Sequence, residues 1–177
     1  MTSADWSVRR LYALDDAHLE GLADVAIDCV EGDASVGFMH PLSRERAVAF
    51  WRGVARGVAA GERALWVGED ASGVCGTVHL LLAQPENQPH RADLTKMLVH
   101  RRARRRGLGA ALLQAAEAAA RDCGKTLLVL DTASADAERL YARGGWVRVG
   151  EIPGYALWPR GGLCATSVFY RQLDERC

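Results

Sequence analysis

The chain has 177 residues, of which 49% are hydrophobic and 25% are charged, and its formal net charge is zero. These values are typical of a globular protein and predict a single domain over residues 1–177. They give no support to bulk binding of nucleic acid or of an anionic membrane. We find neither a membrane-spanning stretch nor a signal-peptide pattern, so we expect a cytoplasmic protein. Five cysteines without a C-x-x-C pair predict no disulfide framework and no metal site.

The hydrophobic periodicity predicts alternating strands and helices along the whole chain. Asp15 or Asp16 is a suitable N-cap for the first helix, and Ser43 for the second. In chain order we expect a strand at 6–11, a helix from 16 to 29, a helix from 43 to 61, strands at 64–69, 73–82 and 92–99, a helix at 108–123, a strand at 127–131, a helix at 135–143, and a final hairpin of strands at 146–150 and 164–170.

Two later segments carry further expectations. Residues 127–131 form an unbroken apolar run that ends in an acid, which is typical of a strand buried on both faces between parallel neighbours. Residues 152–159 predict a long loop that covers part of the molecule. The exposed C-terminal hairpin is a candidate edge for a homodimer.

The most informative stretch is residues 97–113, where an apolar strand runs through a basic turn into an alanine-rich helix. Free backbone amides and a helix N-terminus meet at such a turn and attract a pyrophosphate. Gly107 and Gly109 let the backbone approach a ligand closely. No Lys-Ser/Thr pair follows the turn, and the third glycine of a dinucleotide-binding turn would fall at Leu112, so neither of those nucleotide motifs fits.

The pattern Arg104-x-x-Gly107-x-Gly109 resembles the acetyl-CoA signature of the GNAT superfamily of N-acetyltransferases. The predicted element order β-α-α-β-β-β-α-β-α-β-β also resembles the mixed α/β fold of that superfamily. The resemblance implies a central, mostly antiparallel sheet that splays between the strands at 92–99 and 127–131. In detail the chain is similar to the tabtoxin-resistance type of acetyltransferase, in blocks at 34–39, 91–93, 130–132 and 149–155.

This resemblance implies acetyl-CoA as co-substrate and a small-molecule amine as acceptor, with a tabtoxinine-type β-lactam as the specific expectation and toxin resistance as the outcome. It assigns the pantetheine to the backbone of Met97 and Val99, and the oxyanion to the N–H of Leu98. Among the arginines, Arg104 and Arg106 are favoured over Arg101 as contacts of the adenosine phosphate. The expected cofactor-binding residues are Met97, Leu98, Val99, Arg104, Arg105, Arg106, Gly107, Leu108, Gly109 and Ala110.

An ammonium acceptor must lose a proton before it can attack a thioester. Asp131 ends its strand at the edge where α/β proteins bind ligands, and Asp93 should share a strand face with Met97 and Val99. The resemblance implies both acids as candidate bases, although Asp93 stands where the family has a longer Glu. It also implies that Tyr141 donates a proton to the leaving thiolate. Each residue also has a purely structural interpretation. Asp131 could cap the following turn, Asp93 could be a solvent-facing strand residue, and Tyr141 could be an aromatic that packs its helix on the sheet.

Ser35, Phe38 and the 152–158 segment with Tyr155 are candidate walls of the acceptor site. No Cys-His or Ser-His-Asp arrangement is evident, which favours direct transfer in a ternary complex over an acyl-enzyme. Two alternatives stay open. One is acetylation of a protein or peptide, and the other is a non-catalytic acyl-CoA-binding module, against which Asp131 and Tyr141 argue.

Overall fold

The computed structural model describes residues 5–173, so the single domain predicted over 1–177 extends beyond the described residues at both ends. The observed order of elements is the predicted one. The elements are β1 (Trp6–Leu11), α1 (Asp16–Glu31), α2 (Arg44–Ala59), β2 (Arg63–Asp70), β3 (Gly73–Leu81), β4 (Arg91–Val99), the short 3-10 helix η1 (Arg101–Ala103), α3 (Leu108–Asp122), β5 (Leu127–Thr132), α4 (Ala135–Arg143), β6 (Val147–Leu157) and β7 (Leu163–Gln172).

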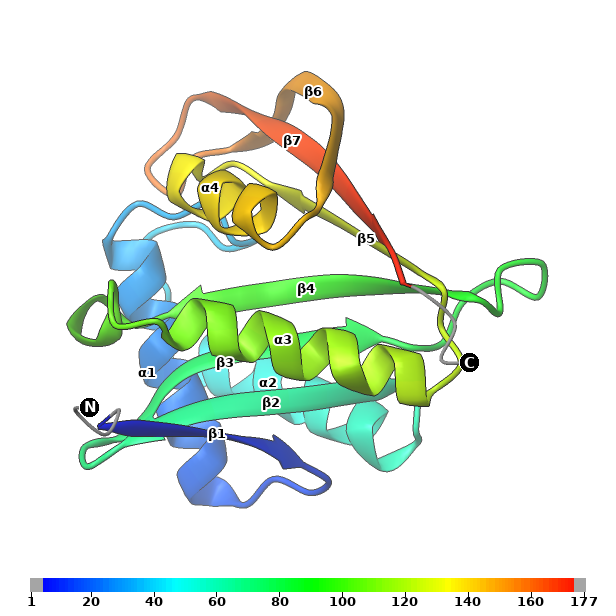
Figure 1. Ribbon diagram of the computed structural model, residues 1–177. Helices are drawn as coiled ribbons and strands as arrows, with labels where there is room; N and C mark the ends of the chain where they lie inside the picture. The colour runs from blue at the N-terminus through cyan, green and yellow to red at the C-terminus, as the bar shows by residue number, and fades with distance from the viewer. Residues whose placement is uncertain (1–4, 174–177) are drawn as a thin grey trace.

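The strands form one seven-stranded sheet in the order β1-β2-β3-β4-β5-β7-β6. Every neighbouring pair is antiparallel except β4 and β5, which are parallel. Figure 1 shows α3 in front of the N-terminal half of the sheet and α1 and α2 behind it, while α4 lies over the C-terminal strands. None of the helices in residues 5–173 is long and apolar enough to cross a membrane.

The predicted caps begin the first two helices. The side chain of Asp15 accepts a hydrogen bond from the His18 amide at 2.8 Å, and Ser43 Oγ accepts one from the Arg46 amide at 3.3 Å. Such caps satisfy amides that the first turn of a helix leaves without partners. The two helices then pack together through an apolar core on their side of the sheet, which includes Leu22, Val25, Trp51, Leu65 and Val67.

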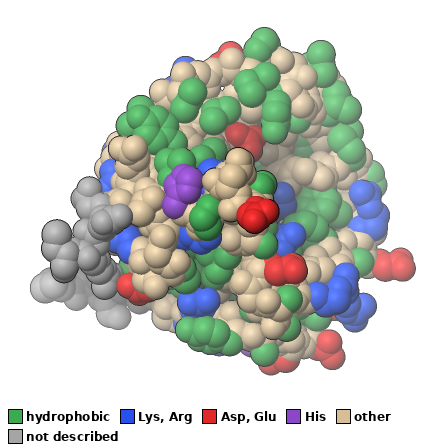
Figure 2. All heavy atoms as spheres, turned by 90° about the vertical axis from the view of Figure 1, so that its right-hand side faces the viewer, with side chains coloured by type: hydrophobic (Ala, Val, Ile, Leu, Met, Phe, Trp, Pro, Cys, Tyr) green, Lys and Arg blue, Asp and Glu red, His purple; other side chains and the backbone are tan. Residues whose placement is uncertain are grey.

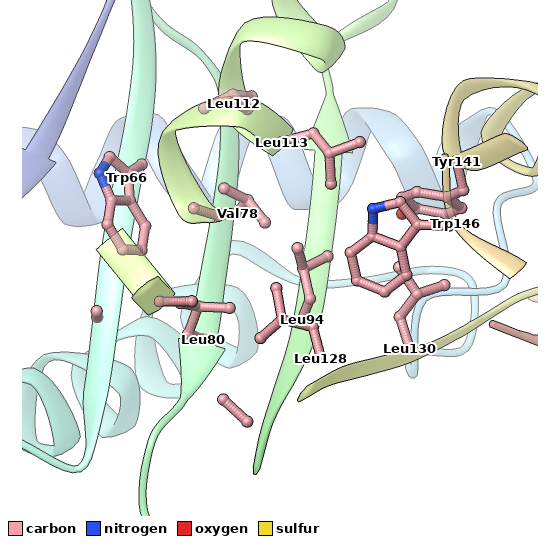
Figure 3. Packing of buried hydrophobic residues seen from close by; sticks show 14 of the residues in the cluster. Trp66, Val78, Leu80, Leu94, Leu112, Leu113, Leu128, Leu130, Tyr141 and Trp146 are labelled. Atoms are coloured by element: carbon pink, nitrogen blue, oxygen red, sulfur yellow. The ribbon is translucent and has the colours of Figure 1, made fainter. Parts of the chain in front are cut away.

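A second core lies between α3, α4 and the opposite face of the sheet (Figure 3). Leu112 and Leu113 of α3 are buried in it, and each buried leucine stabilises the fold by about 1.5–3 kcal/mol. Tyr141 of α4 packs against Trp146 with 5.7 Å between the ring centroids. Trp146 Nε1 donates to Glu117 Oε1 at 2.7 Å in the buried interior. This hydrogen bond ties the C-terminal strands and α4 to α3.

The strands β4 and β5 are paired only at their beginnings. Their register joins Arg91–Asp93 to Leu127–Val129, and no pair follows Asp93 among the described residues. In Figure 1 the two strands lie together near the 82–90 loop and then move apart. The predicted splay between these strands is therefore confirmed, and it leaves one edge of β4 open.

Two predictions about the C-terminal strands are wrong. The second neighbour of β5 is the antiparallel β7, and burial alternates along β5, so this strand is not enclosed between parallel neighbours. Residues 152–157 belong to β6 rather than to a loop. Figure 2 shows hydrophobic side chains gathered on the upper part of one face of the molecule, and β6 and β7 contribute exposed apolar residues such as Val149 and Leu163. The homodimer edge stays a prediction.

Candidate active site

A cavity of about 930 Å³ lies where β4 and β5 diverge. Its walls come from the second half of β4, the 103–110 turn, the end of β5, α4, the α1–α2 loop and the β6–β7 hairpin. This volume lies in the range that small-molecule sites occupy. The elements that the sequence analysis associated with cofactor, catalysis and acceptor thus meet at one place.

The open edge of β4 presents backbone groups to this cavity. The His100 amide donates to the Cys75 carbonyl at 2.9 Å, and Leu98 lies opposite Thr77 in the same ladder. Because hydrogen-bonded and non-hydrogen-bonded pairs alternate, the Leu98 amide is turned toward β3. The amides of Met97 and Val99 are turned toward the open edge instead. The structure therefore does not offer the Leu98 N–H as the predicted oxyanion donor.

The turn before α3 adds a second set of backbone donors. Gly107 is the N-cap of α3 with φ of 82°, and no side chain caps the helix. The amides at the start of α3 are left for water or a ligand, and the helix dipole favours an anion there. A Cβ on Gly109 would lie 3.3 Å from Leu140 Cδ2, so this glycine also lets α3 approach α4 closely.

The two arginines predicted to contact the adenosine phosphate have other partners. Arg106 lies outside the cavity lining, and its Nη2 pairs with Asp5 Oδ2 at 3.0 Å. Arg104 lines the cavity, but its Nε donates to the Val99 carbonyl at 3.0 Å. Both side chains are therefore held by the protein itself.

The other three arginines of the basic run are either held in ion pairs or line the cavity. Arg101 pairs with Asp28 at 2.9 Å and Arg102 with Asp70 at 2.8 Å. Arg105 lines the cavity with a left-handed backbone, φ of 59°, and makes no hydrogen bond or ion pair within residues 5–173. It is the one guanidinium of this run that is free for an anionic ligand in the part of the chain described.

Asp131 and Tyr141 both line the cavity. The carboxylate of Asp131 is exposed to it and accepts a hydrogen bond from Thr166 Oγ1 at 2.8 Å. Tyr141 is only 3% exposed and also packs against Phe169, with 5.8 Å between ring centroids. Burial, and secondly the charge of Asp131, raise the pKa of the Tyr141 phenol above its usual value. The phenol is therefore protonated at neutral pH and can act only as an acid.

Asp93 does not join these residues. It is not part of the cavity lining, and its carboxylate is held by an ion pair with Arg91 and a 3.2 Å hydrogen bond from Gln84. The prediction that Asp93 shares a face with Met97 fails because Lys96 has a left-handed backbone, φ of 51°, within a β-bulge. The extra residue moves Met97 to the α3 side of the sheet and leaves Asp93 on the other side.

Of the three residues predicted to line the acceptor site, two are found in the cavity wall. Ser35 and Tyr155 line the cavity, and Ser35 Oγ donates to the Leu157 carbonyl at 3.3 Å. Phe38 is not a lining residue; its ring packs edge-on against Phe50 at 5.1 Å. The sequence analysis missed Lys96, which lies in the cavity wall. The signal available for it was a lysine, one of only two in the chain, in the strand that leads into the glycine turn.

Comparisons with known proteins agree with this geometry. The family model described as "Acetyltransferase (GNAT) domain" matches residues 61–148. An uncharacterized N-acetyltransferase from the hisH-hisA intergenic region of Azospirillum brasilense is 34% identical over 129 residues, which cover 72% of this chain and 75% of the relative. The chain belongs to the GNAT family of N-acetyltransferases. The predicted superfamily is therefore confirmed, whereas the finer similarity to the tabtoxin-resistance type stays a prediction.

Solved structures of GNAT proteins share the fold over nearly the whole chain. The acetyltransferase yncA of Salmonella typhimurium, solved with its cofactor acetyl-CoA, has a TM-score of 0.77 at 19% identity and covers 98% of this chain and 96% of its own. A GCN5-related N-acetyltransferase from Kribbella flavida has a TM-score of 0.76 at 23% identity, with 96% and 98% covered. These likenesses confirm the predicted mixed α/β GNAT fold.

Proposed function

We propose that this GNAT protein transfers the acetyl group of acetyl-CoA directly to the amine of a small-molecule acceptor in a ternary complex. One observation carries the proposal: the open edge of β4 leads into the uncapped N-terminus of α3 along a single cavity. An extended chain of amides that ends in a pyrophosphate, as in CoA, matches these two kinds of backbone donor in order.

Each part of acetyl-CoA then has partners of suitable chemistry. The edge-facing groups of Met97 and Val99 pair with the pantetheine amides as an added strand does. The pyrophosphate binds the amides from Gly107 to Ala110, and the free guanidinium of Arg105 adds positive charge beside it. The Val99 carbonyl already accepts hydrogen bonds from Arg104 Nε at 3.0 Å and from the weak donor Cys29 Sγ at 3.8 Å, so the amide of Val99 is its group for the pantetheine.

The acceptor chemistry falls to the two side chains at the end of β5 and on α4. Asp131 takes a proton from the acceptor ammonium, directly or through water, and the neutral nitrogen attacks the thioester carbon. An edge-facing amide of Met97 or Val99 stabilises the charge that develops on the thioester oxygen. As the C–S bond breaks, the Tyr141 hydroxyl donates its proton to the sulfur, and the second proton lost by the nitrogen restores the phenol.

The volume of the cavity and the resemblance of the chain to tabtoxin-resistance enzymes support a small acceptor. Ser35 and Tyr155 line the same cavity as Asp131, and the chain resembles tabtoxin-resistance enzymes in the segments that contain them. We therefore place a tabtoxinine-type β-lactam first among the acceptors to be tested, ahead of a protein or peptide amine.

Two measurements test the proposal. Calorimetry with acetyl-CoA should give saturable heat, and a thiol-release assay should show CoA release that depends on an amine. The amine panel contains small amines, tabtoxinine-β-lactam and short peptides. Release with peptides alone would favour the peptide alternative. Heat without release for any amine would indicate the acyl-CoA-binding module, and absence of heat would refute both.

A further inference from the structure

Lys96 is a half-buried cation in the wall of the cavity that the proposed transfer reaction leaves without a role. Its backbone is left-handed at the β-bulge, a conformation that residues other than glycine seldom adopt. The ammonium lies 5.6 Å from the centroid of the Phe50 ring, and a Cβ on Gly37 would come within 3.4 Å of it. Within residues 5–173 the Nζ makes no hydrogen bond and no ion pair.

The surroundings of this ammonium do not neutralise it. Burial lowers the pKa of Lys96, the carboxylate of Asp131 partly offsets this by raising it, and the cation of Arg63 lowers it to a smaller extent. His79, which lies on the neighbouring strand, is buried and uncharged at neutral pH because burial lowers its pKa to about 3. Among residues 5–173 the ammonium contacts the ring of Phe50, which stabilises a cation, but it has no carboxylate in ion-pair contact. Strained backbone positions cluster at functional sites, and an unpaired half-buried charge is costly unless a ligand compensates it.

The position of Lys96 along β4 separates it from the proposed cofactor groups. The open edge at Met97–Val99 and the turn at Gly107 follow it in order toward the pyrophosphate end. Lys96 therefore lies beyond the thioester end, on the acceptor side, near Gly37 of the α1–α2 loop. Asp131 lines the same cavity from β5 and does not form an ion pair with Lys96.

We propose that Lys96 is an anion subsite that binds a carboxylate of the acceptor while Asp131 receives its amine. The acceptor is accordingly an amino acid that carries both groups. This inference rests on the proposed acetyl transfer for the role of Asp131. Two opposite charges that line one cavity without touching each other match the two charges of such a zwitterion.

The first test needs no enzymatic activity. The chain contains two lysines, Lys96 and Lys125, so protein labelled with ¹³C-lysine gives two Cε signals. Lys125 is an internal control, because its Nζ donates to the carbonyls of Leu82 at 3.1 Å and Pro89 at 2.7 Å, outside the cavity lining. Acetate should shift the Lys96 signal saturably and raise the pKa of Lys96, while leaving Lys125 unchanged. Chloride at equal ionic strength should do neither.

The second test uses kinetics with α-amino acids and their carboxamides in matched pairs. Wild-type protein should favour the acid of each pair. Lys96→Met should lower the ratio of kcat/KM for acid over amide about 10- to 100-fold, the loss expected for one charge-assisted hydrogen bond. Lys96→Arg should keep much of the ratio, and Lys125→Met all of it.

The outcomes separate this inference from the proposed function. An unchanged Lys96 signal in acetate, or equal loss for acid and amide in Lys96→Met, would overturn the subsite. Absence of CoA release with every amine tested would overturn the proposed transfer, whereas the NMR result would still decide whether Lys96 binds carboxylates.

Discussion

Replacement of Asp131 by asparagine is the sharpest test of the proposed chemistry. The amide has nearly the shape of the carboxylate and keeps an oxygen for the Thr166 hydroxyl, which lies 2.8 Å away. Since Asp131 is exposed to the cavity, the fold should not change. The variant loses only the proton acceptor. A positioned general base contributes about 10²–10⁴-fold, so Asp131→Asn should raise the barrier by about 3–5 kcal/mol.

The assay is CoA release at saturating acetyl-CoA with an acceptor found in the amine panel. We expect kcat to fall by about two to four orders of magnitude, while the Kd for acetyl-CoA in calorimetry stays near the wild-type value. Asp136→Asn is the matched control, because Asp136 is another exposed acid of the same lining and pairs with Arg139. Turnover within a few-fold of wild type in Asp131→Asn, or an equal loss in Asp136→Asn, would refute the assignment.

Three further variants probe the acid, the cofactor turn and the fold. Tyr141→Phe should lower kcat about 10²-fold or more, as expected for loss of a general acid; an unaltered rate would leave Tyr141 a packing residue. Gly109→Val should weaken acetyl-CoA binding in calorimetry and cost about 1–3 kcal/mol of stability, since the glycine already meets Leu140 closely; an unchanged Kd would contradict this. Asp28→Asn should cost about 1–3 kcal/mol in urea unfolding at neutral pH. Burial raises the pKa of Asp28, but hydrogen bonds from the backbone and guanidinium of Arg101 outweigh this effect and lower the pKa overall. The stability from Asp28 is therefore present above about pH 4 and is lost as the pH falls through the pKa of the folded state. A difference in stability between wild type and variant that persisted in strong acid would exclude this cause.

The order of elements could be predicted because its signals are local. Asp15 and Ser43 cap the helices that the apolar periodicity predicts, and Gly124 follows the end of α3 with a left-handed backbone. The glycine turn before α3 is equally local, since strand, turn and helix follow one another without a gap. Family membership and the place of the proposed cofactor turn follow from these short-range patterns.

Strand partners could not be predicted in the same way. The apolar run of β5 reports burial, but it does not report whether its neighbours run parallel or antiparallel. Pro153 and Gly154 in β6 favour a loop by composition, yet β6 is an edge strand, where proline removes no required hydrogen bond. The register irregularity between Ile152 and Ala156 accommodates both residues.

The side-chain partners of the basic run could not be predicted from the sequence either. Six residues from Arg101 to Arg106 contain five arginines, and sequence spacing gives no means to rank them. Their carboxylate partners, Asp28, Asp70 and Asp5, come from distant parts of the chain. Only the tertiary structure shows that three of the arginines form ion pairs and that Arg104 is held by the Val99 carbonyl, which leaves Arg105 for a ligand.

The bulge at Lys96 accounts for the remaining differences between the predicted and the observed site. Strict alternation along β4 would turn Asp93 and Met97 to one side and Lys96 to the other. One extra residue reverses the second half of the strand, bends it after its last pair with β5, and directs the lysine ammonium into the cavity wall. A lysine has no intrinsic preference for a left-handed backbone, so no local pattern predicts this bulge. The same local distortion therefore excludes one charged residue from the cavity wall and introduces another of opposite sign, so the acceptor specificity that we propose depends on the backbone rather than on the motif.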